Sequence, residues 1–122
     1  VYKRQVLNID VAPSILEMAG ISVSQNMEGQ SFIPILESAS APGRKAWLYE
    51  HFLNFPYREP EMYAVRTQSH IYIEYRGRRK HELYDITMDP SQKNNLINTI
   101  EGAPLAAELR EMLLDLQNGK KY

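Results

Sequence analysis

The 122-residue sequence contains no cysteine, which excludes disulfide bonds and thiolate metal ligands within it. No apolar run approaches the ~20 residues that a membrane-spanning helix needs. The 14 basic and 15 acidic residues are mixed along the chain and leave a formal net charge of −1. Overall charge therefore does not indicate binding to nucleic acid or to an anionic membrane, and partners must be inferred from local sites.

The N-terminus also lacks two features, an initiator methionine and a basic-then-apolar leader with a cleavage site. We treat residues 1–5 as a candidate non-native start, so the missing leader leaves localisation undetermined. A chain of this length can bury roughly two-thirds of its unfolded surface. One hydrophobic core is therefore expected.

The stretch at residues 62–96 carries the strongest local pattern. MYAVRT (residues 62–67) and IYIEY (residues 71–75) alternate between two sides, as half-buried strands do, and the short connection predicts an antiparallel hairpin. The polar run RGRRK (residues 76–80) predicts a turn, so ELYDI (residues 82–86) becomes a third strand.

A capped turn is expected after this third strand. Asp89 reads as an N-cap, Pro90 as the first helical residue and Gln92 as a side chain that reaches back to the cap. Asn95 is expected to end the turn in the left-handed conformation, which leaves Leu96 to pack.

Two helices and one more strand complete the predicted fold. A short helix begins at Asp10 and ends at Gly20, and WLYEHF (residues 47–52) has strand composition. The clearest helix begins near Pro104 and ends before Gly119. Its apolar stripe consists of Leu105, Leu109, Met112, Leu113 and Leu116. The predicted class is α+β, a small antiparallel sheet of about four strands packed by a C-terminal helix.

The order of these pieces resembles the C-terminal region of the sulfatase family, within the alkaline-phosphatase-like superfamily. The family pattern is a hairpin of the type AVRT…KYI.Y, then ELYDL, then DPxExxNL, and here Ile86 and Gln92 depart from it. Upstream, NIDVAPSILEMAGI (residues 8–21) is similar to the family helix DlaPTlldlaGi. EGQSFIPIL (residues 28–36) is similar to dGxSLlPlL. Together the matches cover most of residues 6–117.

The resemblance implies a sulfuric ester hydrolase of the type I, formylglycine-dependent class. It assigns residues 1–45 to the end of a catalytic α/β domain with its linker, and residues 46–122 to the C-terminal subdomain. The nucleophile, a formylglycine made from a C/S-x-P-x-R motif, and its calcium ion are expected in the larger N-terminal domain. The isolated chain is therefore expected to be inactive. The implied partners are that domain and a sulfated carbohydrate or aryl sulfate, in a periplasmic, secreted or lysosomal enzyme.

SAPGR (residues 40–44) formally satisfies the nucleophile motif. It falls where the family has a variable linker, so we interpret it as a solvated linker and predict no catalytic residue in this chain. No dense carboxylate cluster suggests a metal site, because Asp10, Asp85 and Asp89 are better explained as helix caps or strand-end residues.

Two residues are predicted to contact substrate, His51 and Arg66. His51 ends a strand before an aromatic and proline-rich loop, and it could hydrogen-bond a sugar or sulfate; the alternative is a structural histidine on a sheet edge. The guanidinium of Arg66 could bind sulfate or a sugar carboxylate, but the residues favour the alternative, an ion pair with Glu50 or Glu74 within the sheet. His70 and His81 adjoin turns and have weaker claims.

Two alternatives remain open at this stage. The tail of a related phosphodiesterase or phosphonate hydrolase could share the same pieces, since fold does not choose between sulfate and phosphate. A non-catalytic module could bind polyanions through the basic turn, although such a turn also serves as a solvated tip that discourages edge pairing. Its residues are Arg76, Arg78, Arg79 and Lys80.

Overall fold

A computed structural model describes residues 5–52, 56, 60–77 and 80–122. The chain folds as two compact units, Val1–Arg44 and Lys45–Tyr122. The first unit contains a 3-10 turn, η1 (Asn8–Asp10), and two helices, α1 (Val11–Met18) and α2 (Ile33–Glu37). No helix in the described parts of the chain is long and apolar enough to cross a membrane.

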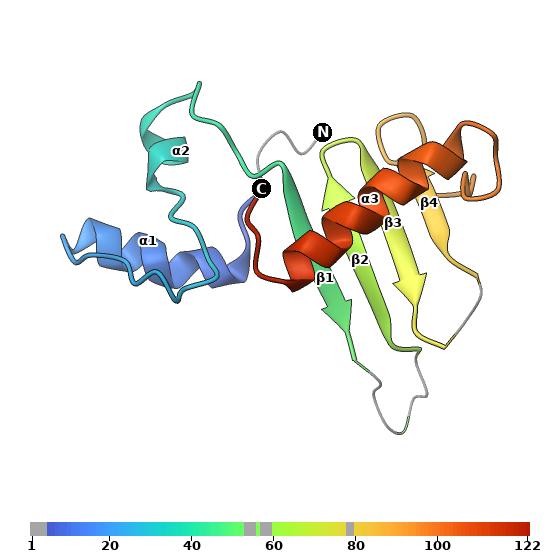
Figure 1. Ribbon diagram of the computed structural model, residues 1–122. Coiled ribbons are helices and arrows are strands. Elements are labelled where there is room, and N and C mark those ends of the chain that lie inside the picture. The colour runs from blue at the N-terminus through green and yellow to red at the C-terminus, as the bar shows by residue number, and fades with distance from the viewer. Residues whose placement is uncertain (1–4, 53–55, 57–59, 78–79) are drawn as a thin grey trace. The chain divides into compact units, whose positions relative to one another are not determined.

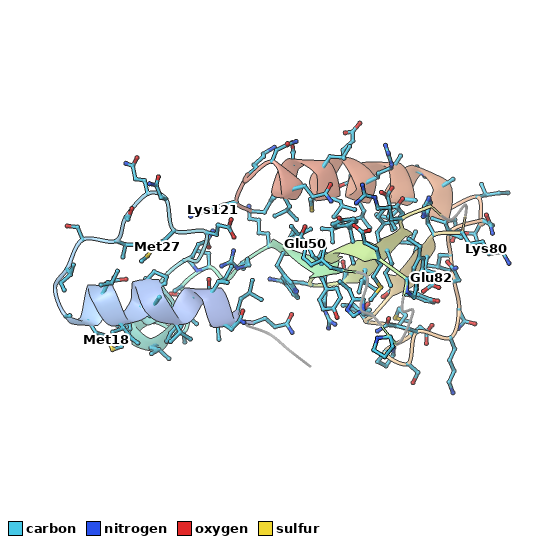
Figure 2. The ribbon with its side chains drawn as sticks, turned by 90° about the horizontal axis from the view of Figure 1, so that it is seen from below. Met18, Met27, Glu50, Lys80, Glu82 and Lys121 are labelled. Carbon is cyan, nitrogen blue, oxygen red and sulfur yellow. The ribbon has the colours of Figure 1, made fainter. Side chains whose placement is uncertain are left out.

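The second unit is a four-stranded antiparallel sheet with one helix across it (Figure 1). The strands are β1 (Ala46–His51), β2 (Met62–Thr67), β3 (His70–Tyr75) and β4 (Glu82–Asp85), which pair in chain order. The helix is α3 (Gly102–Gln117). Figure 2 shows α3 and the sheet as two layers. The predicted α+β class, the sheet and the C-terminal helix are all confirmed.

The core of this unit lies between α3 and the sheet. Its buried cluster consists of Ala46, Val65, Tyr72, Leu83, Leu109 and Leu113, each 3% exposed or less. Ala64 of β2 is also buried, at 1% exposure, but lies outside this cluster. The predicted stripe of α3 supplies Leu109 and Leu113 to the cluster, and Leu105, Met112 and Leu116 pack at its margin. The hydroxyl of Tyr72 donates a 2.9 Å hydrogen bond to Glu74. Burial, together with this bond, raises the pKa of Tyr72 far above its ordinary value, so the phenol stays neutral in the core.

The connection from β4 to α3 differs from the predicted capped turn. Asp89 accepts hydrogen bonds from the amides of Lys93 and Asn94, at 2.7 and 2.8 Å, rather than capping a helix at Gln92. The left-handed conformation belongs to Gln92 (φ +52°), so its assignment to Asn95 was wrong. The competing constraint is tertiary, because the amide oxygen of Asn95 is needed by strand β4.

Asn95 and Leu96 together tie this connection to β4. The oxygen of the Asn95 side chain accepts from the Leu83 amide at 3.0 Å, and the Leu96 amide donates to the Leu83 carbonyl at 2.8 Å. Gly102 then passes so close to the Leu96 carbonyl that a Cβ would collide with it. The chain therefore turns into α3 at a position where only glycine fits.

The first unit is organised by one buried carboxylate. Asp10 was predicted to cap α1, but its side chain makes no cap hydrogen bond. Instead it accepts from the amides of Leu7 and Gln30, both at 2.8 Å, and pairs with the guanidinium of Arg44. Gly20, where the short helix was predicted to stop, has the left-handed conformation expected of such a stop (φ +71°).

Leu83→Ala is expected to destabilise the second unit by about 2–5 kcal/mol, because the fully buried side chain leaves a cavity between β4 and α3. Leu114→Ala is the matched control, since Leu114 is 41% exposed on α3. Urea unfolding followed by far-ultraviolet circular dichroism measures both. Equal unfolding midpoints for the two variants would contradict this assignment of the core.

Candidate functional site

The two predicted contact residues lie on the same face of the sheet. Side chains alternate along a strand, and Ala46 and Val65 belong to the core beneath α3. His51 on β1 and Arg66 on β2 therefore project to the opposite side. We call this side the distal face. Its residues are Trp47, Tyr49, His51, Met62, Ala64, Arg66, Ile71, Ile73, Tyr75, Glu82 and Tyr84.

The register separates the two residues along that face. His51 lies opposite Met62, whereas Arg66 lies opposite Trp47. The offset is four residues, or ~13 Å at ~3.3 Å per residue. The structure therefore places the two side chains at different positions along the face, with Arg66 beside Trp47.

Arg66 packs against Trp47, its cross-strand partner. The guanidinium carbon lies 5.8 Å from the centre of the indole ring, within cation–π range. The suggested pairing with Glu50 or Glu74 does not form, because alternation places both carboxylates on the α3 side of the sheet. Glu74 instead accepts from Arg110 of α3 at 2.8 Å. Among the described residues, none accepts a hydrogen bond from the buried Nε of Arg66.

His70 and His81, the weaker candidates, lie apart from the distal face. His70 projects toward the α3 side, where its Nδ1 is 2.9 Å from the Ser69 hydroxyl and its Nε2 is 3.8 Å from Asp85. His81 precedes β4, and its ring lies 6.3 Å from that of Tyr72. His70 thus has local partners that explain its position without a ligand.

The basic turn is only partly described, because Arg78 and Arg79 lie outside the described residues. Arg76 is exposed and donates a 2.7 Å hydrogen bond to Glu61. Hydrogen bonds from Tyr63 and Arg76 lower the pKa of Glu61, so that carboxylate stays ionised and offsets the arginine charge. The polyanion hypothesis therefore gains no support from Arg76.

The motif SAPGR contains a residue whose role the sequence did not reveal. Arg44 is not solvated, since its side chain is 8% exposed and bound to Asp10. Ser40 is exposed and hydrogen-bonds to Ser38. The interpretation of the motif as a solvated linker was thus wrong for Arg44. No local pattern could have paired two residues 34 positions apart.

The carboxylates considered for calcium have structural partners. One oxygen of Asp85 accepts from the Thr87 hydroxyl at 2.6 Å and from the amides of Thr87 and Met88. Across the residues that the structure describes, no group of three His, Asp or Glu side chains could hold a metal ion. The carboxylates of these described residues therefore do not form a calcium site.

Comparison with known proteins identifies the class of this fold. The chain superposes with a TM-score of 0.80 and 31% identity on a structure described as in complex with its substrate D-glucosamine-2-N,6-O-disulfate. The match covers 90% of this chain and 23% of that one. It places the chain in the alkaline-phosphatase-like sulfatase fold.

A family model described as N-sulphoglucosamine sulphohydrolase, C-terminal, matches residues 1–119. The chain therefore belongs to this family and is a C-terminal region of the sulfatase family, as its resemblance implied.

Curated relatives agree with this assignment. N-acetylglucosamine-6-O-sulfatase of Bacteroides thetaiotaomicron is 34% identical over 122 residues, which cover 95% of this chain and 21% of the relative. Arylsulfatase of Clostridium perfringens is 25% identical, over 92% of this chain and 22% of the relative. The chain thus spans about a fifth of the length of these proteins.

A further match, to a phosphonate monoester hydrolase of Agrobacterium radiobacter, has a TM-score of 0.74 at 21% identity and covers 92% of this chain and 25% of that one. At this identity it shows a shared fold and does not favour phosphonate or phosphate chemistry.

Arg44→Met is expected to destabilise the first unit by about 3 kcal/mol, because it leaves the Asp10 carboxylate buried without its cation. Ser40→Ala is the control within the same motif and should leave stability unchanged, since the hydroxyl is exposed. The Gln30 amide donates a hydrogen bond to Asp10, so its hydrogen-exchange protection reports whether the carboxylate stays in place. Equal protection in the two variants would show that Arg44 does not hold this carboxylate.

Thr87→Val is expected to raise the pKa of Asp85 toward its ordinary value of 3.8. The hydroxyl of Thr87 is the largest cause of the lowered pKa, and valine removes that donor while keeping the side-chain shape. A carbon-13 NMR titration of the carboxyl group measures the shift, with Ser91→Ala as an exposed control in the same connection. An unchanged Asp85 titration in Thr87→Val would refute this account of the turn.

Proposed function

We propose that this chain is the C-terminal part of a sulfatase that hydrolyses a sulfate ester on a sulfated hexosamine. The observation that carries the proposal is the superposition, at 31% identity, on a protein whose structure holds D-glucosamine-2-N,6-O-disulfate as its substrate. A second relative is named for the 6-O-sulfate of N-acetylglucosamine. Both names describe compact, anionic amino sugars, which is the substrate class proposed here.

In this proposal the reacting groups lie outside the chain. Sulfate ester hydrolysis requires a strong oxygen nucleophile and positive groups that stabilise the charge developing on the sulfate oxygens. Formylglycine and calcium would supply them, and the resemblance assigns both to the N-terminal domain. The 122-residue chain alone is accordingly expected to be inactive.

The proposed role of this chain is to form part of the substrate pocket and to support the catalytic domain. His51 is the residue best placed for contact, since it ends β1 at one edge of the distal face. An imidazole there can donate a hydrogen bond to a sulfate oxygen or a sugar hydroxyl, and so orient the sugar without joining the chemistry. Arg66 stays a predicted contact through its terminal nitrogens. The aromatic residues Phe55 and Tyr57 of the following loop lie outside the described residues.

The reading frame that contains this chain provides the first test. Cloning it from the source DNA should reveal an upstream C/S-x-P-x-R motif together with acidic and amide residues for calcium. The expressed protein should then release sulfate from glucosamine 6-sulfate. If both motifs are absent upstream, a stand-alone binding or structural domain becomes the better account.

His51→Ala in that longer protein is expected to lower kcat/KM roughly ten- to hundredfold, the equivalent of about 1.5–3 kcal/mol for a hydrogen bond to a charged group. The effect should appear mainly in KM, because the contact exists before the reaction. His70→Ala is the matched control, as its ring projects to the α3 side. Steady-state kinetics on glucosamine 6-sulfate measure both variants. A larger loss in His70→Ala than in His51→Ala would overturn the assignment of His51.

A further inference from the structure

The connection between β1 and β2 begins directly after His51, the residue proposed to contact substrate. β1 ends and β2 begins at the same end of the sheet (Figure 1). Phe52 is the first residue of this connection and Glu61 is the last. Both lie within the described part of the chain, and each contacts the same residue, Tyr63 of β2. The two ends of the connection are therefore joined through one side chain.

Tyr63 makes these two contacts with different parts of its side chain. Its ring meets that of Phe52 edge to face, with ring centres 6.4 Å apart and an interplanar angle of 83°. Its hydroxyl donates a 2.6 Å hydrogen bond to Glu61. This bond raises the pKa of Tyr63, so the phenol remains a donor at neutral pH. Both contacts are directional, and they fix the orientation of the two ends as well as their separation.

Arg76 holds Glu61 from the side of β3. Its guanidinium donates to the same carboxylate oxygen, Oε1, at 2.7 Å, and its amide donates to the Glu61 carbonyl at 2.9 Å. The amide bond extends the β2–β3 ladder one residue beyond the pair of Met62 with Tyr75. Side chain and backbone thus both tie Glu61 to the sheet. We call Tyr63, Glu61 and Arg76 the loop clamp.

His51 lies between two residues that are placed against Tyr63. Glu50 is opposite Tyr63 in the register of β1 and β2, and Phe52 meets its ring. The imidazole projects to the distal face, whereas the Tyr63 side chain packs at the margin of the core on the α3 side. Tyr63 can therefore act on His51 only through the backbone of β1, which is held on both sides of the histidine.

We propose that Tyr63 is a positioning residue of the proposed sulfatase, which joins both ends of the β1–β2 connection so that His51 meets the sulfated hexosamine in one orientation. This inference rests on the proposed function and extends it to a side chain on the opposite face of the sheet. A contact held in its bound orientation loses less entropy on binding, and a misplacement of about 1 Å can cost ~10²-fold in rate. Loss of the clamp should affect binding more than chemistry, because the reacting groups are assigned to another part of the enzyme.

A second Tyr–Glu–Arg group in the chain provides a matched control. Tyr72 donates a 2.9 Å hydrogen bond to Glu74, which also accepts from Arg110 at 2.8 Å. The chemistry is that of the loop clamp, but the arginine comes from α3 and the tyrosine belongs to the core. Tyr72→Phe therefore removes an equivalent hydroxyl at a position away from the β1–β2 connection.

Steady-state kinetics of Tyr63→Phe and Tyr72→Phe in the longer protein, with glucosamine 6-sulfate as substrate, test the inference. Phenylalanine keeps the ring that meets Phe52 and removes only the hydroxyl. We expect KM to rise about fivefold in Tyr63→Phe while kcat changes less than about twofold, and both constants to stay within about twofold in Tyr72→Phe. An unchanged KM in Tyr63→Phe would overturn the inference. Equal increases in the two variants would also overturn it, because they would indicate a general loss of stability.

A double-mutant cycle with Glu61→Met tests the route of the effect. Methionine keeps the length of the side chain and removes the carboxylate. If Tyr63 acts through Glu61, the double variant should have the same KM as Glu61→Met alone. Effects of the two substitutions that multiply would overturn the loop clamp, since the hydroxyl would then act without its acceptor.

Hydrogen exchange reports on the loop clamp independently of turnover. The Arg76 amide donates to Glu61, whereas the Ile86 amide donates to Ser69 at the opposite end of the sheet. Tyr63→Phe in the longer protein is expected to lower the protection of the Arg76 amide about threefold or more and to leave that of Ile86 unchanged. Equal protection of the Arg76 amide in the variant and the parent protein would show that the hydroxyl does not hold this end of the connection.

The two proposals fail in distinguishable ways. A longer protein that hydrolyses glucosamine 6-sulfate with the same KM before and after Tyr63→Phe refutes the positioning role and leaves the proposed function standing. A longer protein that does not hydrolyse this substrate refutes the proposed function, and the positioning role falls with it.

Discussion

The fold of the second unit depends on Leu83, which is fixed by its side chain and by both of its backbone groups. The side chain is fully buried against α3, while the amide and carbonyl bond to Asn95 and Leu96. These backbone bonds occupy the edge of β4 that faces away from β3, which would otherwise be open to another strand. The same two bonds position Leu96 and hence the entry into α3 at Gly102. One residue thus couples the edge of the sheet to the helix that covers it.

That coupling gives the sheet two different faces. The α3 side is closed by leucines and by ionic contacts such as Arg110 with Glu74. The distal face carries aromatic and aliphatic side chains together with Arg66, whose Nε has no acceptor among the residues described. The two residues predicted to contact substrate, His51 and Arg66, both lie on the distal face.

Local pattern was sufficient for most of the fold. Alternation predicted β2 and β3, and the spacing of Leu109 and Leu113 predicted the buried stripe of α3. Prediction from local pattern failed where a side chain hydrogen-bonds to a backbone group far away in the sequence. Asn95 resembles a turn residue locally, but its carboxamide is committed to Leu83, 12 positions away.

The candidate site was harder to predict from the sequence than the fold was. Alternation along β1 and β2 is enough to place His51 and Arg66 on one face, but their separation follows from the register of Trp47 against Arg66, which turn composition alone does not fix. The cation–π contact between Arg66 and Trp47 could likewise be recognised only once the register of β1 and β2 was known. The same holds for the finding that Glu74 does not pair with Arg66. Family resemblance supplied the function class, whereas the positions of these side chains came from tertiary structure.

The residues SAPGR show why a motif must be judged by what its side chains contact. A nucleophile motif needs its serine in a site that can activate it, yet Ser40 is exposed and bonds only locally to Ser38. The arginine of the motif is buried, but its charge is used to neutralise Asp10, which also holds the Leu7 and Gln30 amides. An arginine committed to a buried carboxylate cannot also stabilise charge on a sulfate. The sequence SAPGR therefore matches the motif by residue type only, and its arginine has a structural role within the first unit.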